Sequence, residues 1–283
     1  MKNKLKEIFK NFLSISQVGN RRQVKKLNGA HYAARALTVL PRDTFLVSYP
    51  KSGNTWLRFL VGNLIYSQNH QVTFTTIESL VPDIYRNTDK ALLAVQQPRY
   101  LKSHEPYDPR YTRVIHLIRD PRDIAVSYYY HLIKVRRIRD DLPIDQWLDS
   151  FLQGSYHPQF GTWESNAKSW MAASDQIPYY LQIRYEDLQH DPIRILGEIA
   201  TFLGYSYSSD HLKQVIDLSS ADRMRKLESQ EKWQPFDGDM RQDISFIRSA
   251  KSGDGKEKLS LEALEKIEQA WGETISRLGY EYP

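Results

Sequence analysis

The sequence of 283 residues contains no cysteine. This absence excludes disulfide bonds, a thiolate nucleophile and any metal site built with cysteine ligands. It also agrees with a reducing compartment, and we expect a cytoplasmic protein. The chain lacks any apolar run that approaches the ~20 residues of a membrane-spanning helix. We find no apolar core of a secretory signal in its first residues.

Acidic residues are scarce at the start of the chain. Residues 1–42 contain ten Lys or Arg side chains and a single acid, Glu7, so this leader carries +9. The formal net charge of the whole chain is +5, and residues 43–283 therefore carry −4. Because the positive charge belongs to the leader, we do not expect a nucleic acid as partner. We interpret residues 43–283 as one folded domain.

The basic leader also has the apolar spacing of an amphipathic helix. Its apolar residues fall at helical intervals with lysines between them: Leu5, Ile8, Phe9, Phe12 and Leu13. Two interpretations are open. The helix either docks on its own domain, or it lies on a membrane surface through residues 1–15 and brings the protein to an amphiphilic molecule.

Continuous apolar runs alternate with helical patterns along the rest of the chain. Four runs predict buried strands at residues 44–48, 99–103, 113–118 and 179–184. Helical patterns cover residues 55–67, 121–139, 143–153, 161–174, 192–203, 209–218 and 260–277. This order predicts an α/β fold, a single domain whose central, mainly parallel sheet is flanked by helices. Ligands bind such sheets beyond the carboxyl ends of the strands.

Residues 49–56, with the sequence YPKSGNTW, follow the first predicted strand and lead into a helix. A strand, a glycine-containing turn and a helix N-terminus form an anion site, because free backbone N–H groups and the helix dipole point at the ligand. Gly53 lets the backbone approach that ligand, and Lys51 adds charge. The loop differs from the usual ATP-binding pattern G-x-x-x-x-G-K-[ST], because its lysine precedes its only glycine.

A second anion site is predicted where the third strand ends. Arg119 follows this strand, and Asp120 and Pro121 have the residue types of an N-cap and a first helical position. Ser127 lies about two turns into the resulting helix. The planar guanidinium of Arg119 can form paired, charge-assisted hydrogen bonds, and Ser127 adds a hydroxyl. The two residues are therefore candidates to bind a second phosphate.

With these motifs in order, the chain resembles the cytosolic-type sulfotransferases. The loop YPKSGNTW is similar to the 5′-phosphosulfate loop of that family, and residues 118–131, IRDPRDIAVSYYYH, are similar to its 3′-phosphate motif. Residues 101–106, LKSHEP, resemble its lysine–x–histidine catalytic segment. Residues 184–188, RYEDL, resemble its tyrosine-containing strand end. The resemblance covers roughly residues 40–280.

The resemblance implies a P-loop-like sulfotransferase architecture for residues 43–283, with 3′-phosphoadenosine 5′-phosphosulfate as donor co-substrate. The enzyme would pass the sulfonyl group to a hydroxyl or amine of a small-molecule or lipid-like, amphiphilic acceptor. The implied donor-binding residues are Lys51, Ser52, Gly53, Asn54, Thr55, Trp56, Arg119, Ser127, Tyr185 and Arg248. We expect no metal, because lysines neutralise the donor. Asp120 and Asp123 are interpreted as helix-capping residues.

His104 is the candidate general base, and Lys102 and Lys51 complete the implied catalytic set. An unperturbed imidazole has a pKa near ~6.5, so it can accept the acceptor's proton at physiological pH during in-line attack on sulfur. Lys102 lies two positions away on an extended segment and therefore points to the same side as His104. Its ammonium discourages protonation of the imidazole and stabilises charge in the transition state. Lys51 neutralises the departing phosphate oxygen.

Other segments qualify the resemblance. In the family, a loop with the pattern R-K-G-x-x-G-D-W-K closes over the nucleotide, and we call the corresponding residues 248–256 the lid. Its sequence here is RSAKSGDGK, so several residues of the pattern are replaced and we expect weaker donor binding. We also expect a flexible loop at residues 253–255. Glu105 stands where the family often has leucine, which favours a polar or cationic acceptor. The cluster of Lys134, Arg136, Arg137 and Arg139 is interpreted as a solvated helix end. No C-terminal dimerisation motif is evident, and the oligomeric state stays open.

Two other functions fit parts of the sequence. A P-loop-type nucleotide kinase or hydrolase also binds phosphate at a strand–helix turn, but it needs Mg2+, so metal dependence discriminates it. A non-catalytic nucleotide-binding protein is favoured by the altered lid and disfavoured by the presence of both Lys102 and His104. The arrangement of motifs favours the sulfotransferase.

Overall fold

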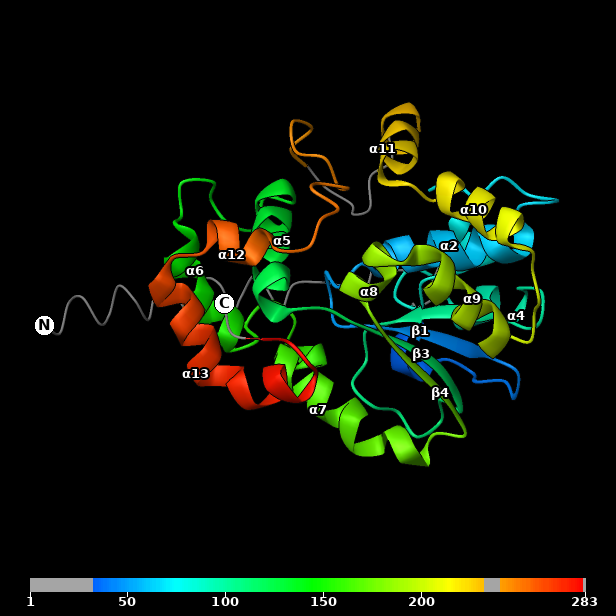
Figure 1. The fold of residues 1–283 in the computed structure, drawn as a ribbon, viewed down its shortest axis with the longest axis horizontal. Coiled ribbons are helices and arrows are strands. Elements are labelled where there is room, and N and C mark those ends of the chain that lie inside the picture. Colours follow the sequence, from blue (N-terminus) through cyan, green and yellow to red (C-terminus); the bar gives the residue numbers. More distant parts are fainter. Residues whose placement is uncertain (1–32, 232–239, 282–283) are drawn as a thin grey trace, which may run out of the picture.

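The computed structural model describes residues 33–231 and 240–281. The predicted amphipathic helix of the leader falls outside these residues. They contain a four-stranded sheet in the order β2-β1-β3-β4, and all its neighbouring strands are parallel. Figure 1 shows helices on both sides of this sheet and a further group of helices beside it. The α/β architecture with a central parallel sheet is therefore confirmed.

The strands lie where continuous apolar runs predict them: β1 (Thr44–Val47), β2 (Tyr100–Ser103), β3 (Arg113–Ile118) and β4 (Tyr179–Arg184). β1 is fully buried, because it pairs with a strand on each side and is covered on both faces. Val47 aligns with Ser103 of β2 and with His116 of β3. The carboxyl end of β1 therefore lies between its neighbours, and the predicted site residues follow it.

One face of the sheet is covered by α2 (Asn54–Tyr66), α8 (Tyr185–His190), α9 (Pro192–Phe202) and α10 (Ser209–Leu218). Buried side chains of these helices form one core cluster with Leu46 of β1 and Ile115 of β3. Phe45 of β1 belongs to a different cluster, which contains Trp170 of α7 (Trp163–Ala173). The alternation of side chains along β1 thus divides the core between the two faces.

A further group of helices packs beside the sheet: α5 (Pro121–Lys134), α6 (Ile144–Leu152) and α13 (Leu261–Arg277). Its core contains Trp147 and Trp271. α12 (Asp254–Lys258) lies against α5. This group brings the C-terminal part of the chain next to the helix that follows β3.

Six predicted helices are confirmed within a few residues: α2, α6, α7, α9, α10 and α13. The sequence does not predict α3 (Ile77–Leu80), α4 (Asp89–Leu93), α8, α11 (Ala221–Gln230) or α12. Short 3-10 turns complete the described elements: η1 (Ala34–Ala36), η2 (Pro158–Phe160) and η3 (Ser174–Gln176). No helix in the two described ranges has both the length and the apolar composition needed to cross a bilayer.

α5 ends earlier than predicted. It stops at Lys134 rather than at residue 139, and Arg136 just beyond it adopts a left-handed backbone with a φ of 52°. The prediction of a solvated helix end is also wrong for Lys134, which is buried. The ammonium of Lys134 donates to the carbonyl oxygen of Ile244 at 2.5 Å. This bond joins α5 to the segment that precedes the lid.

Candidate active site

A tight turn of residues 48–53 connects β1 to α2 and contains the first residues of the predicted donor loop, residues 49–56. Lys51 and Gly53 both adopt left-handed φ angles, 72° and 99°. A Cβ atom on Gly53 would lie 2.7 Å from the ring of Tyr185, so this position requires glycine for its conformation and for its space. The ring of Trp56 lies edge-on to the same tyrosine at 5.5 Å. The turn thereby brings two predicted site segments, the loop and Tyr185, into contact.

The polar residues of the loop have different surroundings. Asn54 is buried, and its amide nitrogen donates to the carbonyl oxygen of Leu46 at 2.9 Å and to the hydroxyl of Ser48 at 3.0 Å. These bonds fasten the loop to β1. Ser52 is also buried, yet its hydroxyl has no hydrogen-bond partner within the described part of the chain. Such a hydroxyl costs free energy unless a ligand or water satisfies it.

Arg119 links the donor loop, the lid and Tyr185. Its Nη2 atom donates to the carbonyl oxygen of Lys251 at 2.7 Å, and its Nη1 atom donates to that of Lys51 at 3.4 Å. The guanidinium lies over the ring of Tyr185, 4.2 Å from the centroid. It also pairs with the carboxylate of Asp123 at 3.3 Å. Its buried Nε atom has no partner among the described residues, so one donor is left for an anion.

The lid contains more regular structure than predicted. The expected flexible loop at residues 253–255 includes the start of α12, with Gly253 as its N-cap. Asp123 accepts hydrogen bonds from the backbone nitrogens of Gly253 at 2.9 Å and Gly255 at 2.8 Å. Asp120 caps α5 as predicted, by accepting from the backbone nitrogen of Arg122 at 2.9 Å. Asp123, in contrast, does not cap its own helix, because its carboxylate holds the N-terminus of α12.

Gly255 explains one departure from the family's lid pattern. A Cβ atom at this position would lie 2.6 Å from the backbone of Arg122, so a larger residue would push α12 away from α5. The glycine that replaces the pattern's tryptophan thus permits this close contact. Within the lid, Arg248 and Asp254 form an ion pair, and the hydroxyl of Ser249 donates to the carboxylate of Asp254 at 2.7 Å.

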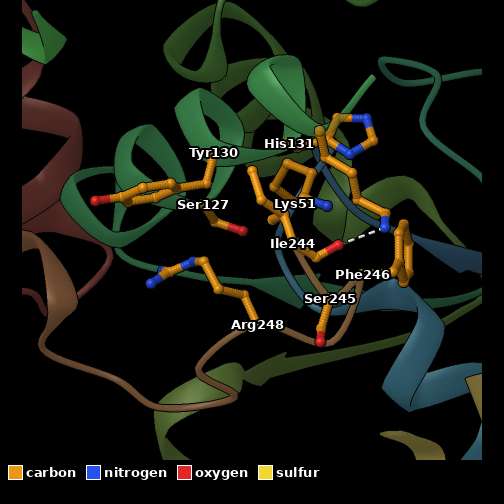
Figure 2. Close-up of a pocket in the computed structure, with 9 residues that line it drawn as sticks. Lys51, Ser127, Tyr130, His131, Ile244, Ser245, Phe246 and Arg248 are labelled. Carbon is orange, nitrogen blue, oxygen red and sulfur yellow. Dashed lines mark hydrogen bonds between the residues drawn. The ribbon is translucent and has the colours of Figure 1, made fainter. Parts of the chain in front are cut away.

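A pocket lies between the donor loop, α5 and the segment before the lid (Figure 2). It is lined by Lys51, Ser127, Tyr130, His131, Lys134, Ile244, Ser245, Phe246 and Arg248. Three predicted donor ligands, Lys51, Ser127 and Arg248, are thus brought together. The ammonium of Lys51 lies 4.7 Å from the ring centroid of Phe246. Phe246 and Lys134 belong to no predicted motif, so the sequence alone does not place them in this pocket.

Several positively charged side chains lie near Lys51 and affect its pKa. Burial lowers its pKa to about 7, and the charges of Lys102, Arg119 and Arg248 add to this effect, while Glu228 opposes it. In the described ranges, no three His, Asp or Glu side chains are grouped as metal ligands. A pocket that assembles these cations favours a multiply charged anion, and such an anion favours the charged form of Lys51.

His104 lies just beyond β2, beside the end of β1. Its Nδ1 atom lies 2.6 Å from the carbonyl oxygen of Ser48. A carbonyl oxygen only accepts, so Nδ1 carries the proton and the free lone pair is on Nε2. Burial lowers the pKa of His104 well below 6.5, and the charge of Lys102 lowers it further. The imidazole is therefore neutral and oriented, as a general base must be.

Lys102 has a buried counter-ion, because its ammonium lies 2.5 Å from the carboxylate of Asp83. The same carboxylate accepts from the backbone nitrogen of Tyr85 at 2.9 Å. Burial alone would raise the pKa of Asp83, yet the charges of Lys102 and Arg58 hold it below its usual value. Asp83 lies in none of the predicted motifs, and the sequence does not reveal this role.

Aromatic rings surround His104. The ring of Tyr85 stacks on the imidazole at 6.0 Å, and the ring of Phe160 lies edge-on to it at 5.6 Å. His157 lies 5.7 Å from Phe160 and 5.6 Å from Tyr128. The hydroxyl of Tyr128 is buried and has no hydrogen-bond partner in the described structure. These rings form an aromatic wall next to the imidazole, with one unsatisfied hydroxyl in it.

Glu105 does not provide a free carboxylate for the acceptor. It is buried, and its Oε1 atom accepts from the hydroxyl of Tyr85 at 3.2 Å. Its Oε2 atom pairs with the guanidinium of Arg35. The expected preference for a cationic acceptor therefore has no support in the structure, because Arg35 already neutralises this charge.

Comparison with known proteins gives a consistent result. Residues 41–279 match the family model described as Sulfotransferase domain. Flavonol 3-sulfotransferase of Flaveria bidentis is 24% identical over 277 residues, which cover 89% of this chain and 88% of the relative. Sulfotransferase 1E1 of Bos taurus is 28% identical over 244 residues, which cover 81% of each chain.

Solved structures agree in fold. Retinol dehydratase in complex with androsterone and the inactive cofactor PAP has a TM-score of 0.72 at 20% identity, covering 89% of this chain and 85% of that chain. Mouse sulfotransferase SULT7A1 in complex with PAP has a TM-score of 0.66 at 20% identity, covering 86% of this chain and 87% of that chain. At this identity the similarity establishes the fold alone.

Proposed function

The chain belongs to the Sulfotransferase domain family and is a sulfotransferase, and we propose that its donor is 3′-phosphoadenosine 5′-phosphosulfate and its acceptor a hydroxyl or amine of a small or lipid-like molecule. The observation that carries this proposal is the placement of Lys51 and His104 at the end of β1. Lys51 lies in the loop that follows this strand, and the imidazole is bonded to Ser48 of the same loop. An anion-binding loop and an oriented neutral base therefore follow two neighbouring strands, β1 and β2, and are joined by this hydrogen bond.

The residues of this chain fit the donor. The hydroxyl of Ser52 and the Nε atom of Arg119 are buried without partners in the described ranges, and both suit an anionic ligand. We assign to donor binding Lys51, Ser52, Gly53, Asn54, Thr55, Trp56, Arg119, Ser127, Tyr185 and Arg248. Of these, Asn54 acts by fastening the loop to β1. When bound, the donor supplies an activated sulfonyl group on a phosphate leaving group.

His104 is assigned as general base. Its Nε2 atom accepts the proton of the acceptor hydroxyl while the oxygen attacks sulfur in line with the departing phosphate. Lys51 and Lys102 stabilise the negative charge that develops on the departing oxygen. Asp83 holds the ammonium of Lys102 in place by an ion pair. The aromatic wall excludes water from this step.

A small, largely apolar acceptor fits the aromatic wall. Rings of Tyr85, Phe160 and Tyr128 offer flat surfaces, and the hydroxyl of Tyr128 offers one hydrogen bond to a polar group of the acceptor. The names of the relatives point the same way, since one acts on flavonols and one solved structure holds androsterone. We would therefore test flavonols and steroids first as acceptors.

The proposal extends to the organisation of the chain. Residues 43–283 form the catalytic domain of a cytoplasmic enzyme, and residues 1–42 form an accessory leader. Contact of residues 1–15 with a membrane surface is tested by flotation with anionic vesicles, using the full chain and a chain without these residues. Equal recovery with the vesicles would contradict that contact.

Thermal unfolding with nucleotides tests the donor site. A ligand at ~100 times its dissociation constant stabilises the folded state by about 2.7 kcal/mol, which corresponds to roughly 5–10 °C for a domain of this size. We expect this shift with adenosine 3′,5′-bisphosphate, a smaller one with 5′-AMP, and no requirement for Mg2+. A shift with ATP and Mg2+ alone would instead indicate a kinase or hydrolase. Transfer of labelled sulfonyl to 4-nitrophenol, kaempferol or estradiol then tests catalysis.

A further inference from the structure

The segment Ala33–Leu37 precedes the part of the chain that matches the family model, residues 41–279, yet it is fastened to the active-site side of the domain. The backbone nitrogen of Ala33 donates to the carbonyl oxygen of Asn87, and that of Ala34 donates to the carbonyl oxygen of Ile84, each at 2.8 Å. The side chains of Ala33 and Leu37 are buried. This segment therefore lies along the stretch that follows Asp83.

Arg110 adds a second attachment to the same segment. Its Nη2 atom donates to the carbonyl oxygen of Arg35 at 2.8 Å, and its Nη1 atom donates to that of Leu37 at 3.2 Å. The backbone around Arg35 is thus held from two directions. Because the backbone is held, the guanidinium of Arg35 projects from a fixed point.

The guanidinium of Arg35 joins two segments that are far apart in the sequence. It pairs with the carboxylate of Glu105 and donates to the carbonyl oxygen of Gln159 at 2.8 Å. The side chain of Arg35 is 58% exposed, whereas that of Glu105 is 4% exposed. Glu105 is the position where the family often has leucine, and its charge is met by a residue outside the family-matched range. The carboxylate of Glu105 can therefore be buried at this position because the guanidinium of Arg35 neutralises it.

One segment that Arg35 joins carries the imidazole of His104, and the other carries the ring of Phe160. Glu105 follows His104 directly, and Tyr85 connects the two residues. Its hydroxyl donates to Glu105 at 3.2 Å and accepts from the backbone nitrogen of His104 at 2.9 Å. Gln159 precedes Phe160, whose ring lies 5.6 Å from the imidazole. The guanidinium thus holds the residue next to this ring, in addition to the buried amide of Asn166, which donates to the carbonyl oxygens of Phe160 and His104, each at 3.2 Å.

The second of these segments, residues 154–161, is a loop closed at its base. Gly154 and Gly161 both have positive φ angles, 69° and 71°, and a Cβ atom on Gly154 would lie 3.2 Å from the backbone of Gly161. The ends of the loop therefore meet, and its free side carries His157, Gln159 and Phe160. Arg35 contacts that free side through Gln159.

We propose that Arg35 is a positioning residue of the acceptor site, which clasps loop 154–161 to the segment of His104 and thereby sets the affinity for the acceptor. This inference rests on the proposed function, because it assumes that the acceptor enters beside His104. The side chain of Arg35 touches neither the donor loop nor a residue that lines the pocket of Lys51, so we expect its replacement to change acceptor binding more than donor binding. The basic leader is thus connected through its last residues to the acceptor side of the enzyme.

Three variants test the clasp. Arg35→Ala removes it and leaves the buried carboxylate of Glu105 without its counter-ion. Arg35→Ala combined with Glu105→Gln removes the clasp and the unpaired charge together, so it separates loss of positioning from loss of folding. Arg42→Ala removes another arginine of the leader, which is exposed, and serves as the matched control for charge.

Hydrogen exchange of residues 154–161 gives a readout that needs no turnover. We expect faster exchange in Arg35→Ala and in the double variant, and no change in Arg42→Ala. Unchanged exchange in both Arg35 variants would overturn the proposal. A lower melting temperature in Arg35→Ala that is recovered in the double variant identifies the unpaired Glu105 as the source of instability.

Kinetics with kaempferol then test the role in acceptor binding. We expect KM for kaempferol to rise roughly tenfold or more in both Arg35 variants, because small displacements of binding groups weaken positioning strongly. The dissociation constant for adenosine 3′,5′-bisphosphate should stay within about twofold, since additivity holds for separate sites. Equal losses for donor and acceptor would overturn the assignment. If the unaltered protein binds no bisphosphate and transfers no sulfonyl group, the proposed function fails, while hydrogen exchange still decides the clasp.

Discussion

The Nδ1 atom of His104 lies 2.6 Å from the carbonyl oxygen of Ser48, the residue that follows β1. This single contact fixes the tautomer of the imidazole and leaves Nε2 as the basic nitrogen. Lys51 lies in the same loop as Ser48. The proposed base and the proposed donor loop are therefore joined directly at the end of β1.

Replacing His104 by alanine tests the base directly. We expect His104→Ala to lower kcat by about 10²–10⁴-fold, the range that a positioned general base contributes. The affinity for adenosine 3′,5′-bisphosphate should be retained, because the imidazole does not line the pocket of Lys51. Steady-state kinetics and calorimetry measure the two quantities.

The exposed residue His190 provides the matched control for that substitution. His190→Ala should leave both kcat and nucleotide affinity unchanged, since its side chain lies on the surface of α8. Parallel losses of turnover and nucleotide binding in His104→Ala would show that the histidine supports the structure and is not the base.

Binding of the bisphosphate should be linked to protonation of Lys51. Its pKa of about 7 in the free protein means that much of it is neutral at pH 8. A bound phosphate favours the ammonium form and raises this pKa, so binding at pH 8 takes up protons and the affinity falls as the pH rises from 7 to 9. Calorimetry in two buffers of different ionisation enthalpy measures the uptake. Equal binding enthalpies in both buffers at pH 8 would contradict the prediction.

Asp83→Asn tests the counter-ion of Lys102. Loss of the carboxylate leaves a partly buried ammonium without its partner, so Lys102 is no longer held in one place. We expect kcat to fall by about tenfold, because a displaced ammonium stabilises the transition state less well. An unchanged kcat together with a lower melting temperature would indicate that Asp83 acts on folding alone.

Stability should decrease in mild acid. Burial lowers the pKa of His104 and His131 well below 6.5, and that of His116 to about 3. The unfolded chain binds protons at these histidines below pH ~6.5 while the folded chain does not, so their contribution is present above that pH and is lost as the pH falls. Together they lower the free energy of unfolding by up to about 4 kcal/mol per pH unit. Urea midpoints at pH 7.5, 6.5 and 5.5 measure this, and a constant midpoint would contradict it.

The sequence predicts the sheet because continuous apolar runs mark buried parallel strands, and β1 to β4 all match such runs. The two phosphate motifs predict that Lys51 and Ser127 lie near each other, and the resemblance to the sulfotransferases adds Arg248; the three side chains line one pocket. These features are local or are repeated along the chain. A pattern of residue types is sufficient to reveal them.

The sequence does not predict contacts that close over long separations. The ion pairs Asp83–Lys102 and Arg35–Glu105 form because the fold brings separate segments together. The spacing of these residues in the sequence predicts neither pair. The place of Asp123 after Asp120 and Pro121 predicts a residue that caps α5, yet its carboxylate binds the lid more than a hundred residues away. α5 is shorter than predicted because the backbone turns at Arg136, where the residue types still favour a helix.

The arrangement around β1 separates what this enzyme must keep from what it can change. Ser48 and Lys51 lie within one short turn, so the hydrogen bond to the imidazole of His104 and the lysine assigned to the donor are held by the same segment. The aromatic wall comes from other parts of the chain, including loop 154–161 and the stretch that carries Tyr85. Acceptors can therefore be exchanged by changing the other rings of this wall, as long as the hydroxyl of Tyr85, which accepts from the backbone nitrogen of His104, is kept.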